Sequence, residues 1–106
     1  MLYHVTATHG ADNCPAYNPQ QMGEFLTSAD QLEPFAAEIG LKVHFLLWAA
    51  PDHVAYALVE TDNFGAIGRF LNRIPITQDF RITPVQHLKN VVEMGKAIMA
   101  QQQAKG

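Results

Sequence analysis

The chain is short of cysteine, of charge and of long apolar runs. It has 106 residues with one cysteine, so no internal disulfide can form, which fits a reducing cytoplasm. Only 16% of the residues are charged, and the formal net charge is -3, so the sequence has no basic stripe that would bind nucleic acid. No apolar run approaches the ~20 residues that cross a bilayer. The first residues also lack the pattern of a secretory signal. We therefore expect a cytoplasmic protein that binds neither nucleic acid nor membrane.

Hydrophobic residues are well represented, at 48% of the chain. This content and length predict a single packed domain over residues 1–106, with a polar tail at 103–106 that frays. A domain of this size leaves much of its surface in water, and oligomerisation is a common remedy.

Two periodicities of apolar residues predict the secondary structure. Alternation and β-branched content indicate four strands, whereas spacings of three and four residues indicate helices. The first helix is expected to have Asn18 as its N-cap and Pro19 in its first position, and to end at Gly40. It is expected to break in two, because Ser28 can cap a second helix and Pro34 interrupts the backbone bonding. The expected strands are 2–8, 41–49, 53–60 and 77–83. Thr61 or Asp62 is expected to cap a short helix, and a last helix is expected to cover roughly 86–102.

The resulting element order predicts an α+β fold of the ferredoxin-like βαββαβ type with an extra C-terminal helix. Helices should cover one face of a four-stranded antiparallel sheet. The other face would then expose apolar side chains, expected to include Leu46, Trp48 and Leu58, and needs a cover.

In this order, and in a fourth strand that runs through "RITPV" into a tail helix, the chain resembles the dimeric α+β barrel superfamily. The loop "THGADNCP" is also similar to a "TH…CP" loop in small relatives of this barrel whose chemistry is not established. The resemblance implies a homodimer in which two sheets pack face to face around a cavity for a small molecule. It covers most of the chain and implies no particular activity, because one fold hosts many chemistries.

One predicted site lies on the sheet face turned away from the helices. Alternation and antiparallel pairing place His4, His44 and Glu60 at one end of that face, with His44 opposite Glu60 if Trp48 pairs with Tyr56. Two imidazoles and a carboxylate can relay protons or bind a divalent metal. They can also form a structural cross-strand pair at a dimer interface.

A second predicted site lies at the opposite end of the sheet. His9 ends the first strand and His53 begins the third, so antiparallel pairing makes them neighbours, and Cys14 follows five residues after His9 in a loop. A thiolate with two imidazoles suits zinc or copper, with Asp12, Asp52 or water as a fourth ligand. The same groups suit an activated thiol. A cysteine before proline can also be a small apolar residue that starts a turn.

Further residues offer contacts to a small molecule. Trp48 and Tyr56 can line a pocket for an aromatic ligand, and Arg81 can hold a carboxylate with two hydrogen bonds. The aromatic side chains can instead fill an interface, and Arg81 can pair with Glu60.

Three functions fit these patterns. The first is a metal- or ligand-binding protein that uses His9, Cys14 and His53, with zinc or copper as the cofactor. The second is a barrel-type oxygenase or isomerase that uses His4, His44 and Glu60 on an aromatic or quinone-like substrate. Haem, with an axial histidine such as His44, is the less favoured cofactor. The third is a non-catalytic regulatory or structural homodimer.

Overall fold

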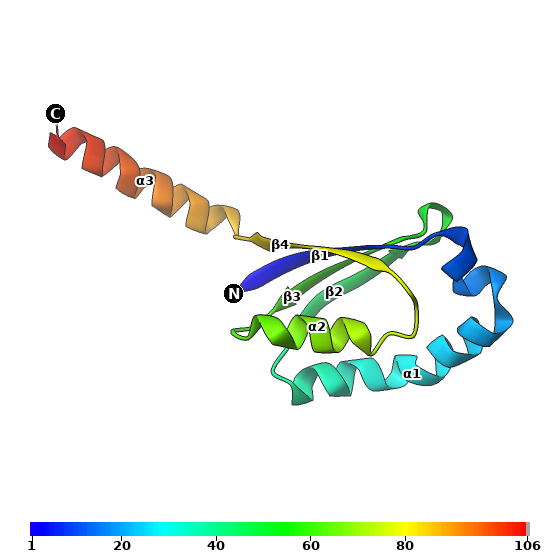
Figure 1. Ribbon diagram of the computed structural model, residues 1–106. Helices are drawn as coiled ribbons and strands as arrows, with labels where there is room; N and C mark the ends of the chain where they lie inside the picture. The colour runs from blue at the N-terminus through cyan, green and yellow to red at the C-terminus, as the bar shows by residue number, and fades with distance from the viewer. Residues whose placement is uncertain (106) are drawn as a thin grey trace.

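The computed structural model describes residues 1–105 and the side chains of residues 1–104. Its main elements, shown in Figure 1, follow the predicted order of strand, helix, strand, strand, helix, strand and helix. Three short 3-10 turns, η1 (Ala11–Asn13), η2 (Pro15–Tyr17) and η3 (Ala50–Asp52), lie in the loops at one end of the sheet. The elements are β1 (Leu2–Thr8), α1 (Pro19–Glu38), β2 (Lys42–Ala49), β3 (Val54–Glu60), α2 (Phe64–Asn72), β4 (Asp79–Val85) and α3 (Leu88–Lys105).

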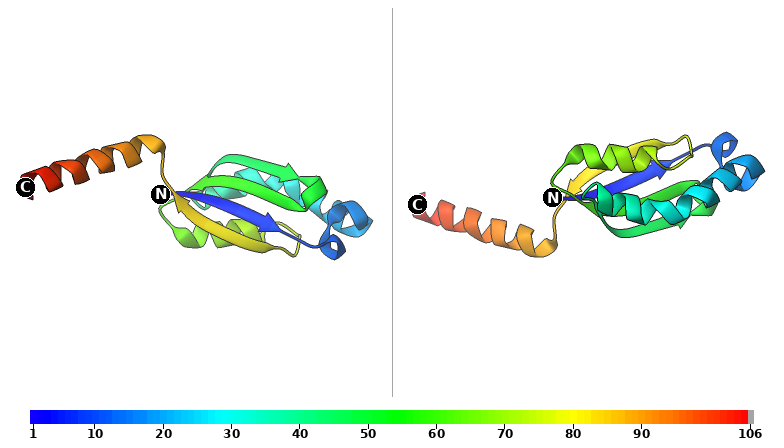
Figure 2. Two further views of the ribbon diagram at one scale, coloured as in Figure 1. Left: turned by 90° about the horizontal axis from the view of Figure 1, so that it is seen from above. Right: turned by 90° about the horizontal axis from the view of Figure 1, so that it is seen from below.

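The four strands form one antiparallel sheet in the order β2-β3-β1-β4. Helices α1 and α2 pack on one face of it, and Figure 2 shows the other face without a helix over it. The predicted α+β class is therefore confirmed, and this strand order is compatible with a ferredoxin-like fold.

The core lies between the sheet and the two packed helices. In β1 and β3 every second side chain is buried there, as strand alternation requires. Helix α2 has the sharper apolar face, because four of its nine residues are buried. The largest fully buried side chains are Phe70, Ile67, Val5 and Val59.

Helix α1 corrects one expectation, because it is continuous. The Asn18 side chain caps it by accepting hydrogen bonds from the backbone N–H groups of Gln20 and Gln21, at 3.1 and 3.2 Å. Ser28 caps nothing, since its hydroxyl donates to the carbonyl of Phe25 within the same helix. Pro34 lies inside the helix without ending it, and the burial of neighbouring residues in the core holds the segment in place.

The N-cap of helix α2 also follows both expected caps, by two residues from Thr61 and by one residue from Asp62. Its N-cap is Asn63, whose side chain accepts a hydrogen bond from the N–H of Gly65 at 3.0 Å. Thr61 instead accepts the N–H of Asn63 through its hydroxyl, at 3.1 Å, and closes the turn before the helix.

A β-bulge in β2 overturns the predicted faces of that strand. Val43 lies opposite Val59, but Phe45 lies opposite Leu58, so one extra residue of β2 is inserted between them. Each side chain after the bulge therefore changes face. Leu46 and Trp48 lie on the helix side of the sheet, and Trp48 pairs with Ala55 rather than with Tyr56.

The open face of the sheet is consequently made of a different set of residues. His4 and Leu58 are paired across β1 and β3, and Tyr56 is paired with Thr6. After the bulge, Phe45 and Leu47 join them from β2. Leu47 is 57% exposed, so this apolar surface is bare in a single chain.

Helix α3 leaves the end of β4 and extends away from the rest of the molecule (Figures 1 and 2). It continues to Lys105, so the tail expected to fray is helical to that point, and Gly106 lies outside the described residues. The principal extents are 65 × 30 × 17 Å. None of the described helices combines the length and apolar character that crossing a membrane requires.

Candidate metal centre

His9 and His53 are joined first by their backbones. His9 directly follows β1, and its N–H donates to the carbonyl of His53 at 3.2 Å. His53 lies just before β3 in a left-handed conformation, with φ 55° and ψ 41°. It is the one non-glycine residue with positive φ among those described. This conformation is costly for a residue with a Cβ, so the local structure holds His53 in a strained orientation beside His9.

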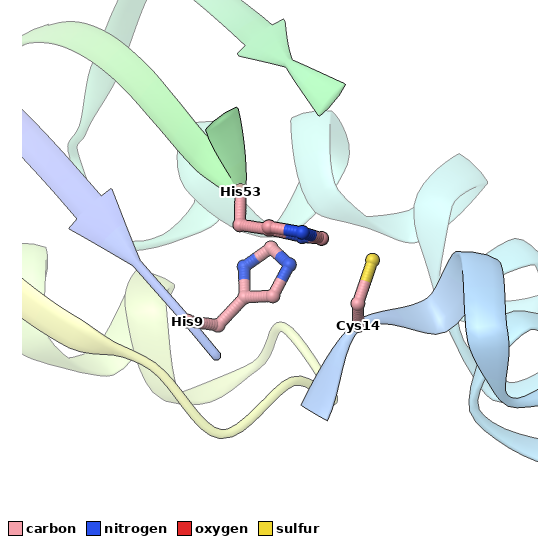
Figure 3. A group of neighbouring side chains, drawn as sticks. All are labelled: His9, Cys14 and His53. Atoms are coloured by element: carbon pink, nitrogen blue, oxygen red, sulfur yellow. The ribbon is translucent and has the colours of Figure 1, made fainter. Parts of the chain in front are cut away.

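Two short turns bring Cys14 back to the same place. The Cys14 N–H donates to the carbonyl of Ala11 at 3.2 Å, and the Cys14 carbonyl accepts the N–H of Tyr17 at 3.0 Å. The glycine, asparagine and proline residues of this loop favour such turns. Figure 3 shows the Cys14 thiol, from the loop, and the two imidazoles pointing toward one another.

The three side chains have the spacing of an incomplete coordination sphere. One ligand atom from each of His9, Cys14 and His53 lies within 4.8 Å of the others. Tetrahedral zinc, with bonds of about 2.0–2.3 Å, holds its ligand atoms about 3.3–3.8 Å apart. Small side-chain adjustments are therefore enough to close the three groups around an ion.

Cys14 and His9 are buried, His53 is half-buried, and three of the four imidazole nitrogens lack hydrogen bonds. Cys14 is 4% exposed and His9 is 8% exposed. Within the described residues, both ring nitrogens of His9 and the Nδ1 of His53 are buried without a hydrogen bond of good geometry, although the Gln78 side chain is close enough to His9 to raise its pKa. Buried polar atoms are almost always satisfied in folded proteins, so these exceptions need an explanation. A metal ion bound by the imidazoles provides one.

The electrostatics favour the metal-binding form of His9. Burial lowers the pKa of His9, and the neighbouring His53 lowers it further, while the Gln78 side chain acts in the opposite direction. A lowered pKa keeps the imidazole neutral near neutral pH, and the neutral imidazole is the form that ligates metals.

Aromatic side chains surround the two imidazoles. The Trp48 ring centroid lies 5.7 Å from that of His9, and the Tyr17 ring centroid lies 5.9 Å from that of His53. Trp48 also lines an apolar pocket of about 50 Å³ between the sheet and the helices, together with Phe25 and Gln78. Sequence patterns indicated neither Tyr17 nor Gln78 as part of this site, because their positions depend on the folding of two irregular loops.

The predicted fourth ligands are not part of the cluster. Neither Asp12 nor Asp52 belongs to the group of metal-binding side chains found in residues 1–105. A bound ion would therefore have three protein ligands and a coordination position for water or another small molecule.

The second predicted site forms only as a pair. His44 Nε2 lies 2.8 Å from Glu60 Oε1, and the hydrogen bond from His44 is the main cause that lowers the pKa of Glu60. The inserted bulge residue is His44 itself, whereas Lys42 is the strand partner of Glu60. The His4 ring instead neighbours Phe45 and Tyr56, with centroids 6.4 and 6.0 Å away. The Glu60 side chain is 50% exposed, so the pair is in contact with solvent.

Trp48 and Tyr56, predicted to line a ligand pocket, both line the small apolar pocket, and Arg81 does not, although strand pairing places Trp48 and Tyr56 on different faces of the sheet. Tyr56 and Arg81 are both paired with Thr6, which places them on the open face of the sheet. Trp48 lies on the helix side because of the bulge. The described residues contain no ion pair between Arg81 and Glu60, whose partner is His44.

Comparison with known proteins leaves the function to be argued from this geometry. No protein-family model matches the chain, and no curated protein gives a significant match.

Proposed function

We propose that this protein binds a divalent transition metal, zinc or copper, through His9, Cys14 and His53. The observation that carries the proposal is the convergence of three ligand atoms within 4.8 Å, at a place where three of the four imidazole nitrogens are buried without a hydrogen bond. A thiolate and two imidazoles are the donors that these two metals prefer. A reduced thiol used in this way suits the cytoplasm.

The chemistry of the site depends on its fourth position. With three protein ligands, a bound ion keeps a position for water or for a small molecule that carries one donor atom. The rings of Trp48 and Tyr17 lie beside the two imidazoles, and both side chains are exposed, so small molecules from solvent can reach the site. The site is therefore suited to holding and exchanging one small ligand.

Metal titration followed by fluorescence tests the proposal. Trp48 is the only tryptophan, and its ring is 5.7 Å from that of His9, so it reports on this site. We expect Cu²⁺ to quench its emission in a saturable titration that ends at one equivalent. The His53→Ala variant should lose the high-affinity phase, whereas His87→Ala, which changes an exposed histidine near α3, should keep it. Identical titrations of wild type and His53→Ala would refute the proposal.

We also propose that the protein is a homodimer of the α+β barrel type, in which the open sheet faces of two copies meet. The support is the apolar surface that includes Phe45, Leu47 and Tyr56, together with the resemblance in element order. Leu47→Glu would bury a charge in such an interface. Sedimentation at micromolar concentration should give a dimer for wild type and a much weaker association for Leu47→Glu. A monomeric wild type would contradict the dimer and leave the metal proposal standing.

Proton transfer by His44 and Glu60 is the alternative function. Their 2.8 Å contact supports it, since a carboxylate can orient an imidazole and raise its basicity. Under this alternative, aromatic or quinone-like ligands raise the melting temperature of wild type but not of His44→Ala. An unchanged melting temperature in wild type would exclude it.

A further inference from the structure

Helix α3 is an 18-residue element without a packing surface in its own chain. Figures 1 and 2 show it continuing beyond the end of β4, on the side of the molecule opposite the loops that hold the candidate metal centre. Its first turn is tied to the preceding residue, because the N–H groups of Asn90 and Val91 donate to the carbonyl of His87. A helix of this length extends about 27 Å.

The first three turns of α3 nevertheless carry apolar residues at the spacing of a packed helix. At 100° per residue, six of its residues form a stripe on one side, which Gln102 interrupts near the C-terminal end and from which Met94 is displaced, and the opposite side carries Asn90, Glu93, Ala97 and Gln101. Each of the large apolar side chains on this stripe is at least 42% exposed in the single chain. The members of the stripe are Leu88, Val91, Val92, Gly95, Ile98 and Met99.

The whole molecule is too extended for its length. Its radius of gyration is 18.2 Å, whereas a compact domain of this length has about 13 Å. Its accessible surface is 7295 Å², whereas a compact monomer of this mass exposes about 5,900 Å². The excess is about 1,400 Å² per chain, or about 2,800 Å² for two copies, and a standard stable interface buries about 1,600 Å² in total.

We infer that the apolar stripe of α3 packs against a second copy of this chain. The excess surface of two copies is sufficient for a stable dimer, and twofold symmetry would form the contact twice. The same chain supplies a second unpartnered apolar surface, on the open face of its sheet, so two copies can satisfy each other without any other protein. This inference rests on the proposed homodimer. It adds a contact in which helix α3 of each subunit, called the arm below, packs against the partner subunit.

Two matched double variants of the full chain test the arm. Val91→Glu with Ile98→Glu places two charges on the stripe, and Asn90→Glu with Gln101→Glu places two charges on the opposite side of the same helix. In sedimentation equilibrium, we expect the stripe variant to raise the dimer dissociation constant at least 100-fold and the control to leave it within threefold of wild type. Because the metal centre lies at the other end of the molecule, both variants should keep wild-type copper quenching of Trp48. That retention also shows that the variant folds.

The remaining outcomes separate this inference from the proposed function. If the stripe variant dimerises as tightly as wild type while Leu47→Glu does not, the arm is wrong and the sheet-face dimer stands. If wild type is monomeric, the arm and the dimer are both wrong, whatever the metal titration shows. Should the stripe variant fail to fold, Val91→Ala with Ile98→Ala replaces it, and an unchanged dissociation constant in that variant overturns the inference.

Discussion

The imidazole rings of His9 and His53 meet edge to face, with their centroids 5.3 Å apart and their planes at 75°. The contact joins the end of β1 to the start of β3, and the thiol of Cys14 completes the group from a loop. Two adjacent imidazoles with unpartnered buried nitrogens are costly unless something binds them. The predictions below follow from a metal ion in that role.

Replacing Cys14 by serine should weaken zinc binding by more than about 100-fold. Loss of an outer-shell partner alone costs about 10- to 100-fold in metal affinity, and Cys14 is a direct ligand in this account. Competition with a chromophoric chelator measures the affinity. The His87→Ala variant serves as the control, and equal zinc affinity in wild type and Cys14→Ser would show that the thiol does not ligate the ion.

Gln78 should position His9 for the metal. Its Oε1 is buried without a partner, and its side chain is close enough to affect the pKa of His9. A metal-bound histidine usually donates its other ring N–H to an oxygen acceptor. Gln78→Leu removes that acceptor and should lower zinc affinity about 10-fold, whereas Gln78→Glu keeps an oxygen and should bind at least as tightly as wild type. Equal affinities for Gln78→Leu and wild type would leave Gln78 without this role.

The positive φ of His53 predicts that glycine at this position gives a more stable protein than alanine does. Glycine adopts positive φ without penalty, so the free energy of unfolding of His53→Gly should exceed that of His53→Ala by about 1 kcal/mol. His53→Gly should therefore unfold at a higher denaturant concentration. Both variants lack the imidazole and should bind zinc equally weakly. Chemical unfolding of the metal-free proteins measures the difference, and equal stability would indicate that the backbone at His53 relaxes.

The pair formed by His44 and Glu60 should contribute to stability above the range in which glutamate titrates. Its hydrogen bond lowers the pKa of Glu60 below the ordinary 4.5, so the folded state binds a proton less readily than the unfolded state. The contribution is therefore present above pH 4.5 and is lost as the pH falls through the lowered pKa. Glu60→Gln should reduce the acid-dependent loss of melting temperature. A wild-type acid profile in that variant would show that the pair has no net effect.

Much of the architecture could be predicted from local patterns. Strand alternation and turn residues predicted the element order, and antiparallel pairing of the first and third strands brought His9 beside His53. The position of Cys14 was harder to predict, because a loop can return toward the strand end or fold away from it. The backbone hydrogen bonds of η1 and η2 decide that question.

The wrong predictions have physical causes that the alternation of side chains along a strand does not reveal. One inserted residue, His44, reverses the faces of Leu46 and Trp48, and no local propensity marked that bulge. The expected break in α1 failed because tertiary packing outweighs the loss of backbone bonding at Pro34. Gln78 was missed because the fourth strand was expected at 77–83, whereas β4 begins at Asp79. Gln78 therefore lies in the loop before the strand, where strand alternation does not fix the direction of its side chain.

Elemental analysis of the protein, purified without chelators and without a histidine tag, tests the central claim most directly. The account predicts close to one equivalent of zinc or copper per chain in wild type and a small fraction of that in Cys14→Ser and His9→Ala. A metal-free wild-type protein that also fails to take up zinc or copper when either is supplied would contradict it.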